Sequence, residues 1–597
     1  MKLIDMMKQR VTVTKKIIQD EYDKIWKKCK DAYNGDHWVK DAPYHTINLI
    51  WATIMTETPA LLFDVPKYTL KPTFTNKMTE DLKLKNEALL NKIIRSKDMA
   101  FKQVIKNAIL AAHMDLGIVE WGCNSKFIDN PNAGQPIMDM ILDPQTKQPM
   151  EIPMQDLDGN PIIEPEKISK DDSFFIKRIE ATDFGFDPSG EEIFKDLKWF
   201  WIRDYITKKK IMETYHVSSK SLEGVNYTIR GYEDIDKDKN NIEMKAELED
   251  IEDNEDYHVI ARYRLFDRTR EELYTFCEGY DKFLDKEPLP ESINIAVLRY
   301  NNKLGEFYQI PEIYPLIDPQ KEIEIATNMI AEHMKKNSRN GWYDENLVDK
   351  NDVKKLEDPY SMTMIPVKKN GQMAFGTIDM GPVDSTVYGN LKTQVDFFNQ
   401  IAGMASSHRG GDAKSSTATA EMISDKYQGI RQKDKGMATR DFLIETGNGL
   451  LNCIQENLTM PMEIEVIGED EKPKVIQYIP TIDKYSNFDA ELDIRSFSAP
   501  NEELERAQWL SLLDIMSKTP HLFTNPVIAK ETLLRHGVES KDLQKAIVQV
   551  AMEMMQQRII EAEMGGGGKN QKGSPPASKQ RGPAQGMAQL MGSQIGR

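Results

Sequence analysis

The 597-residue sequence predicts a protein of the α+β class. Two observations carry this prediction. Apolar residues recur at helical spacing in the first third of the chain and again from about residue 318 onward. Between about 118 and 310 the sequence has short apolar runs and turn signals typical of strands. Hydrophobic residues make up 40% of the chain and charged residues 29%, an ordinary balance for a protein that buries a core.

The first third predicts three helices. In the first, apolar residues from Ile18 to Cys29 recur at helical spacing, and Gly35 follows as a terminator. A second helix fits 79–96. A third starts at Asp98 and stops at Gly117. Apolar stripes of this kind usually face a core, so these helices predict no chemistry.

The strand-rich region contains a predicted arm. Turn signals at Asp143-Pro144 and Asp158-Gly159-Asn160 divide 137–163, which indicates hairpins. The aromatic run 198–202 predicts a buried strand. The segment 233–256 holds twelve acidic residues and three lysines. It is interpreted as a solvated loop, with a cation or partner site as the alternative.

The middle of the chain predicts two helices around a small module. Asp318 as N-cap and Pro319 at the first helical position start a helix that ends near Asn340-Gly341. Short strands and turns follow, and then a second helix at 384–402. A small, polar segment separates it from a helix of about forty residues that starts near Thr419.

The C-terminal region predicts strands near 463–497 and then helices. These helices start at Asn501 and at Asn525-Pro526, and the last spans 540–564. The final 33 residues, 565–597, contain nine glycines, five basic residues and no acid. That composition predicts a disordered basic tail.

The composition argues against several functional classes. The net charge of −17 does not suit a protein that coats nucleic acid by neutralising phosphates. The four cysteines lie far apart and predict free thiols in a reducing compartment. The sequence contains no phosphate-loop, zinc-protease or serine-hydrolase motif, and no two histidines have metal-ligand spacing. The lack of a recognisable site argues against an enzyme without excluding one, and the sequence indicates no metal and no cofactor. The charged start and the lack of a long apolar run predict no membrane segment and synthesis in a cytoplasm.

Several stretches resemble the portal proteins of tailed bacteriophages. They occur in the same order along the chain: Tyr33-Asn34-Gly35-Asp36-His37-Trp38, Asn48-Leu49-Ile50-Trp51, Lys71-Pro72, the segment from Ala181 to Gly190, and the segment from Ser416 to Glu421. The two helices around a small module are similar to the stem and clip of those proteins. The module itself has no recognised signature, and the arm at 137–163 departs from the pattern.

The resemblance implies an architecture with a mixed wing, a two-helix stem, a small α/β clip and a helical crown, assembled into a ring. Its parts would be the wing (1–312), the first stem helix (313–340), the clip (341–382), the second stem helix (383–403), the tunnel loop (404–418), the long helix with returning wing strands (419–500), the crown (501–564) and the tail (565–597).

The resemblance also implies a function. Such a ring, usually of twelve subunits, lies at one capsid vertex of the virion next to the major capsid protein. A terminase motor packages double-stranded DNA through the channel, and head-completion or tail adaptor proteins then attach. An acidic wall repels phosphates, while a few basic rings hold DNA briefly. The candidates for DNA contact are Lys335, Lys336, Arg339, His408, Arg409 and Lys414. Each cluster could instead be helix capping or plain solvated charge.

Two other functions stay open at this point. The chain could be a different virion component, from the neck or tail. It could also be a multidomain enzyme that processes nucleic acid through a site without a known motif.

Overall fold

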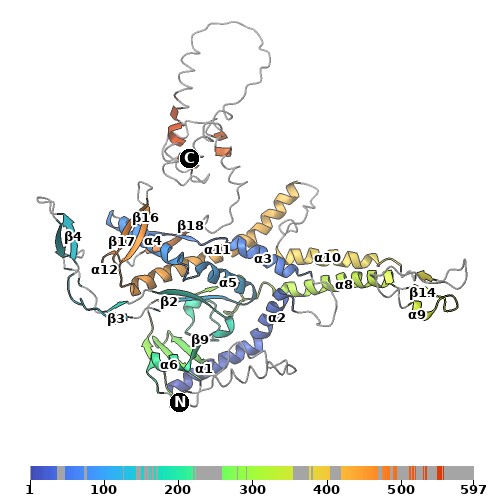
Figure 1. The fold of residues 1–597 in the computed structure, drawn as a ribbon, viewed down its shortest axis with the longest axis horizontal. Coiled ribbons are helices and arrows are strands. Elements are labelled where there is room, and N and C mark those ends of the chain that lie inside the picture. The colour runs from blue at the N-terminus through green and yellow to red at the C-terminus, as the bar shows by residue number, and fades with distance from the viewer. Residues whose placement is uncertain are drawn as a thin grey trace, which may run out of the picture. The chain divides into compact units, whose positions relative to one another are not determined.

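The computed structural model describes residues 2–36, 47–72, 77–124, 173–218, 259–278, 280–290, 292–339, 341–353, 375–377, 381–403, 418–467, 473–484 and 488–493. It also describes residue 222 and short pieces within 127–169 and 510–556. The protein is α+β, as the sequence predicts (Figure 1). The chain divides into two compact units, Met1–Ser498 and Ala499–Arg597. The described part of the second unit consists of short helical pieces around Leu512, Ala529, Leu533 and Ile547.

The N-terminal helices confirm most of the helical pattern. They are α1 (Leu3–Ile17), the π-helical turn η1 (Ile18–Tyr22), α2 (Asp23–Asn34), α3 (Leu49–Leu61), α4 (Lys77–Ile94) and α5 (Phe101–Met114). Gly35 ends α2 with a left-handed φ of 81°, a conformation that suits glycine. The predicted start of the third helix at Asp98 was wrong. Ala100 also has a left-handed φ, of 47°, so α5 begins at Phe101.

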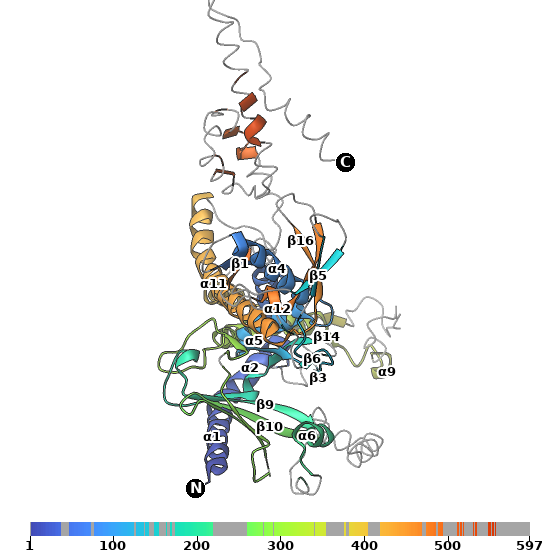
Figure 2. The same cartoon turned by 90° about the vertical axis from the view of Figure 1, so that its left-hand side faces the viewer.

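Two antiparallel sheets form the strand-rich region. One has the order β13-β2-β7, with β2 (Gly117–Cys123), β7 (Phe174–Ile179) and β13 (Ile295–Leu298). The other has the order β12-β11-β10-β9-β8, with β8 (Phe184–Phe186), β9 (Trp199–Thr207), β10 (Val259–Asp267), β11 (Glu272–Cys277) and β12 (Asp285–Pro288). Helix α1 lies beside the five-stranded sheet, and Met7 and Val11 join its aromatic core (Figure 2). The predicted strand at 198–202 is part of β9. The following helix α6 (Lys208–Tyr215) was not predicted.

A two-stranded ribbon leaves the three-stranded sheet where Cys123 pairs with Phe174. It contains β3 (Phe127–Asp129) paired with β6 (Lys167–Ser169), an isolated bridge between Pro136 and Ile163, and β4 (Met138–Leu142) paired with β5 (Pro149–Pro153). These pairings confirm a hairpin within 137–163. We call residues 137–163 the arm.

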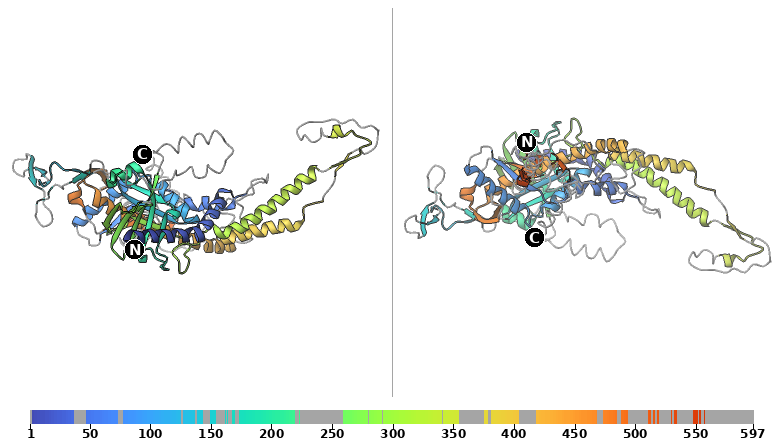
Figure 3. Two further views of the ribbon diagram at one scale, coloured as in Figure 1. Left: turned by 90° about the horizontal axis from the view of Figure 1, so that it is seen from below. Right: turned by 90° about the horizontal axis from the view of Figure 1, so that it is seen from above.

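Two helices pack side by side, and the small module that connects them in the sequence lies at one end of the pair (Figure 3). They are α8 (Ile317–Arg339) and α10 (Ser385–Ala402), and the described part of the module holds β14 (Gly341–Tyr343), α9 (Lys350–Val353) and β15 (Phe375–Thr377). The His333 Nε2–H group donates to the Gly381 carbonyl at 2.8 Å and ties the two ends of the module together. Asp318 is not the N-cap, because α8 starts one residue earlier, directly after the 3₁₀ turn η7 (Tyr314–Leu316). Pro319 then lies among the first four residues, whose N–H groups have no partner within the helix.

The long predicted helix is α11 (Ala418–Asn457). The strands β16 (Met462–Ile467) and β17 (Pro473–Tyr478) form one pair, α12 (Pro480–Asp483) follows, and β18 (Phe488–Asp493) pairs with β1 (Lys67–Pro72). Residues of α4, α5, α11, β2 and β16 share one core that includes Leu89, Ile105 and Leu450. The segments from α11 onward therefore pack into the same core as the helices of the first third of the chain.

Several predictions lie outside the described residues. These are the acidic segment 233–256, the loop at 404–417, the helix starts at 501 and 525, and the tail 565–597.

Candidate functional site

The predicted DNA-contact residues are only partly described. Lys335 is exposed near the C-terminal end of α8. Lys336 and Arg339 belong to the same helix, but the structure does not describe their side chains. His408, Arg409 and Lys414 lie outside the described residues. The described part of the chain therefore does not test whether these six residues come together.

The paired helices α8 and α10 carry exposed apolar side chains. On α8, Ile325, Met329 and Met334 are 52%, 54% and 63% exposed. On α10, Tyr388 and Phe397 are half exposed, although Phe398 is fully buried. These exposed residues lie on more than one side of the pair, because Met334 is two and a half turns from Ile325 on α8, and Phe397 is two and a half turns from Tyr388 on α10. We call Ile325, Met329, Met334, Tyr388 and Phe397 the hairpin stripe.

Four buried charged residues meet at the base of this helix pair. The Lys435 ammonium of α11 donates to Glu57 Oε2 of α3 at 2.8 Å and also to Glu312, just before η7. The His113 Nδ1–H group of α5 donates to Glu312 Oε2 at 2.6 Å. All four side chains are at most 13% exposed. We call Glu57, His113, Glu312 and Lys435 the charged cluster.

Ion pairs and hydrogen bonds between buried side chains hold the charged cluster together. Burial alone would raise the pKa of Glu312, but its hydrogen bond to His113 and the nearby charges of His113 and Lys435 lower that pKa to about 2. Burial and the charge of Glu312 raise the pKa of Glu57 above its usual value. Burial would lower the pKa of Lys435, yet the two carboxylates raise it. The ammonium therefore lowers the pKa of both carboxylates, and at Glu312 the contribution of His113 is larger than that of Lys435.

Further contacts fix the same junction. The Gln309 side-chain amide donates to the carbonyls of Ala112 and Asp115, both at 2.5 Å, and holds the end of α5. One turn before Lys435, the Arg431 guanidinium donates to the Ile401 carbonyl at 3.0 Å, at the end of α10. Lys435 and Arg431 are four residues apart and therefore lie on one face of α11. This face contacts Glu312, in the segment before η7 and α8, and the end of α10.

The charged cluster also has the donor set of a metal site. Ligand atoms of Glu57, His113 and Glu312 all lie within 4.8 Å of one another. However, the Lys435 ammonium binds both carboxylates and supplies the positive charge that a metal would bring. The arrangement therefore fits a structural ion-pair network better than a metal centre.

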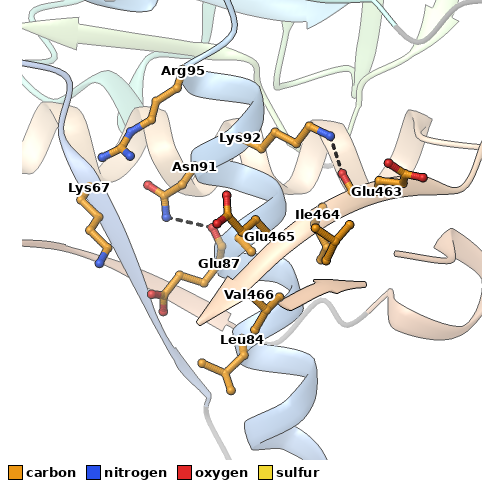
Figure 4. A pocket seen from close by; sticks show the side chains of 12 residues that line it. Lys67, Leu84, Glu87, Asn91, Lys92, Arg95, Glu463, Ile464, Glu465 and Val466 are labelled. Carbon is orange, nitrogen blue, oxygen red and sulfur yellow. Dashed lines mark hydrogen bonds between the residues drawn. The ribbon is translucent and has the colours of Figure 1, made fainter. Parts of the chain in front are cut away.

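A groove lies between β1, α4 and β16 (Figure 4). It has a volume of about 720 Å³ and is lined by basic residues, including Lys67, Lys92 and Arg95, and by Glu87, Glu463 and Glu465. Asn91 caps the strand edge of β1, because its side-chain amide bonds both the N–H and the carbonyl of Tyr68 at 2.9 and 2.8 Å. The lining charges balance, so this groove alone indicates no single ligand.

The charged cluster could not be predicted from the sequence. Its four members come from α3, α5, the segment before η7 and α11, so no local spacing connects them. The available signal was weak and came from His113 alone, which lies in an apolar helical pattern, whereas Lys435 lies in a polar stretch of its helix. Such residues are seldom buried without a partner.

Comparisons with known proteins add no relative. No family model matches the chain, and the search of curated proteins found no match. Among the described residues, no helix is both long enough and apolar enough to cross a membrane.

Proposed function

We propose that this chain is the portal subunit of a tailed bacteriophage, a ring at one capsid vertex through which DNA is packaged and ejected. The observation that carries the proposal is the pair α8 and α10, which brackets a small module and has an apolar stripe that its own chain leaves exposed. The order of paired helices, module and long helix is also the order in the portal resemblance.

Burial of apolar area explains why the hairpin stripe favours a ring. Large apolar side chains exposed on both helices of the pair would be covered in an assembly of copies. Because these side chains lie on more than one side of the helix pair, adjacent copies can cover them from both flanks by repeating one heterologous contact. Such a contact closes into a ring when the rotation fits.

The net charge is compatible with a channel. A chain with charge −17 gives a ring that repels phosphates on most of its surface. DNA then slides past instead of binding tightly, and the basic residues near the end of α8 offer brief contacts. No step of this function needs a catalytic residue.

The test is the oligomeric state of the purified full-length chain. We expect closed rings with a central hole in negative-stain images, and a native mass that is a fixed multiple of the chain. Met329→Glu should shift the protein to smaller species while its circular dichroism stays unchanged. Leu304→Glu is the matched control, because Leu304 is 91% exposed on a loop away from the stripe.

A stable monomer at micromolar concentration and physiological salt would refute the ring. Open or filamentous assemblies without a hole would favour a neck or tail component instead. Equal effects of Met329→Glu and Leu304→Glu would show that the hairpin stripe is not the interface.

A further inference from the structure

A small hollow lies between the N-terminal helices and two loops of the first unit. It has a volume of about 240 Å³. Its lining comes from the end of α1 and from η1, from the end of β8 and the residues after it, and from 305–308. The aromatic residues of the lining are Tyr22, Phe186, Phe307 and Tyr308. We call these four residues the aromatic wall. A hollow of this size suits a ligand smaller than a drug-sized molecule.

The rings of the aromatic wall contact one another in a continuous row. The ring centres of Tyr22 and Tyr308 lie 4.4 Å apart, and those of Tyr308 and Phe186 lie 4.7 Å apart. Phe186 also meets Phe307 edge to face, with ring centres 4.7 Å apart. All four residues are at most 9% exposed, so packing fixes the wall before any ligand arrives. Aromatic rings attract cations through the negative charge on their faces.

The charged residues that line the hollow are all acidic: Glu21, Glu191 and Glu306. Glu306 is already engaged, because it accepts from the Tyr22 hydroxyl and pairs with the Lys303 ammonium. Within the described part of the chain, no basic side chain pairs with Glu21 or Glu191. Glu21 is exposed and Glu191 is half-buried, so both lie at the mouth of the hollow. The mouth therefore carries two carboxylates without a counter-charge.

Two basic side chains contact the aromatic wall without filling the hollow. The Arg299 guanidinium lies 4.4 Å from the ring centre of Phe307 and donates to the Phe307 carbonyl at 2.8 Å. The Lys303 ammonium lies 5.8 Å from the ring centre of Tyr22 and is held by Glu306. Neither basic residue lines the hollow. The rings of the wall therefore already accept cations from within the chain, while the hollow between them and the mouth stays open.

We propose that the hollow binds an aliphatic ammonium group. The alkyl part packs against the aromatic wall, and the ammonium lies at the mouth near Glu21 and Glu191. Such a group matches both parts of the hollow, because it joins an apolar stem to a charged end. A bare metal ion would leave the aromatic wall unused. The same chemistry occurs in free amines and in the lysine side chain of a partner protein. The site goes beyond the proposed ring and does not depend on it.

The first test compares butylamine with butanol, which has the same carbon chain but no charge. The full-length chain is titrated with each compound, and binding is followed by saturation-transfer NMR of the ligand. We expect butylamine to bind with a Kd of about 1 mM, and butanol to bind about tenfold more weakly. Butylamine binding should weaken as salt rises, because the carboxylates at the mouth are partly exposed. Equal binding of the two compounds, or no binding of butylamine, would overturn the proposal.

The second test removes the two carboxylates at the mouth. Glu21→Gln with Glu191→Gln should weaken butylamine binding about fivefold and leave butanol binding unchanged. Asp20→Asn with Glu213→Gln is the matched control, because both acids are exposed and neither lines the hollow. This control removes the same number of charges and should bind butylamine like the wild type. An equal loss in both variants would show attraction by the overall negative charge alone, and the assignment to this hollow would fail.

A third titration distinguishes a free amine from a protein lysine. The probe is Nα-acetyl-lysine methylamide, which carries the ammonium on a lysine stem with a peptide group on each side. Binding tighter than that of butylamine assigns the hollow to a lysine side chain of a partner. Binding weaker than that of butylamine assigns it to a free amine, because the peptide groups then do not fit at the mouth. In either case the loss in Glu21→Gln/Glu191→Gln must be seen with the tighter probe, and its absence would refute the site.

Discussion

Replacing Lys435 by methionine should strongly destabilise the first unit. The change keeps the length of the side chain but removes the ammonium that binds Glu57 and Glu312. Two carboxylates then remain close together in a place that is almost closed to solvent. Breaking a buried ion pair by removing one partner typically costs about 3–5 kcal/mol. We expect a loss in that range, because the His113 hydrogen bond still compensates Glu312 and leaves Glu57 as the main uncompensated charge.

The loss should depend on pH in a defined direction. Burial already raises the pKa of Glu57, and removal of the ammonium raises it further. A carboxyl whose folded-state pKa is raised regains stability as pH falls through that pKa, because the folded state takes up the proton more readily. The difference between wild type and Lys435→Met should therefore be largest near pH 8 and shrink toward pH 5. Glu312 behaves in the opposite sense in the wild type. Its pKa is lowered to about 2, so its contribution is present above about pH 4.5 and disappears as pH falls toward 2.

The assay is urea unfolding followed by tryptophan fluorescence at both pH values, with hydrogen exchange of α11 amides as a local measure. Lys433→Met is the control, since Lys433 is exposed two residues away and its loss should cost less than about 0.5 kcal/mol. The double variant Glu57→Gln/Lys435→Met should recover part of the loss. A pH-independent loss, or strictly additive effects of the two substitutions, would refute the electrostatic account of the cluster.

Two further predictions follow from the same junction. Arg431→Ala should destabilise the end of α10 by about 1 kcal/mol, because the Ile401 carbonyl loses its donor; faster hydrogen exchange there, with α8 unchanged, would show it. Arg409→Ala with Lys414→Ala should lower the DNA packaged or retained per head while ring assembly and thermal stability stay the same. Normal packaging and retention by that variant would end the assignment of 404–418 as a DNA-contacting loop.

The sequence predicts the helices with a clear apolar period better than those without one. The stripes of α8 and α10 have one apolar face, and the structure confirms helices there. The sequence did not predict helix α3, because its apolar residues, such as Ile50, Trp51 and Met55, lie on all sides of the helix and form no single apolar face. That helix carries Glu57. The charged cluster could therefore not be predicted for two reasons. The helix that carries Glu57 has no single apolar face, and the four residues come from segments far apart in the chain.

The contacts of α11 separate the effect of Arg409→Ala with Lys414→Ala from an effect on the packing of the helices. α10 ends at Ala402 and α11 begins at Ala418, so residues 404–417 connect these two helices in the chain. Arg431 bonds the end of α10, and Lys435 bonds the approach to α8, both from one face of α11. Gly403 has a left-handed φ of 68°, and a Cβ there would lie 3.0 Å from Arg431 Cδ, so the exit from α10 is closely packed as well. The contacts of Arg431 and Lys435 therefore join α8, α10 and α11 without residues 404–417. We expect the removal of charge at Arg409 or Lys414 to leave these contacts unchanged.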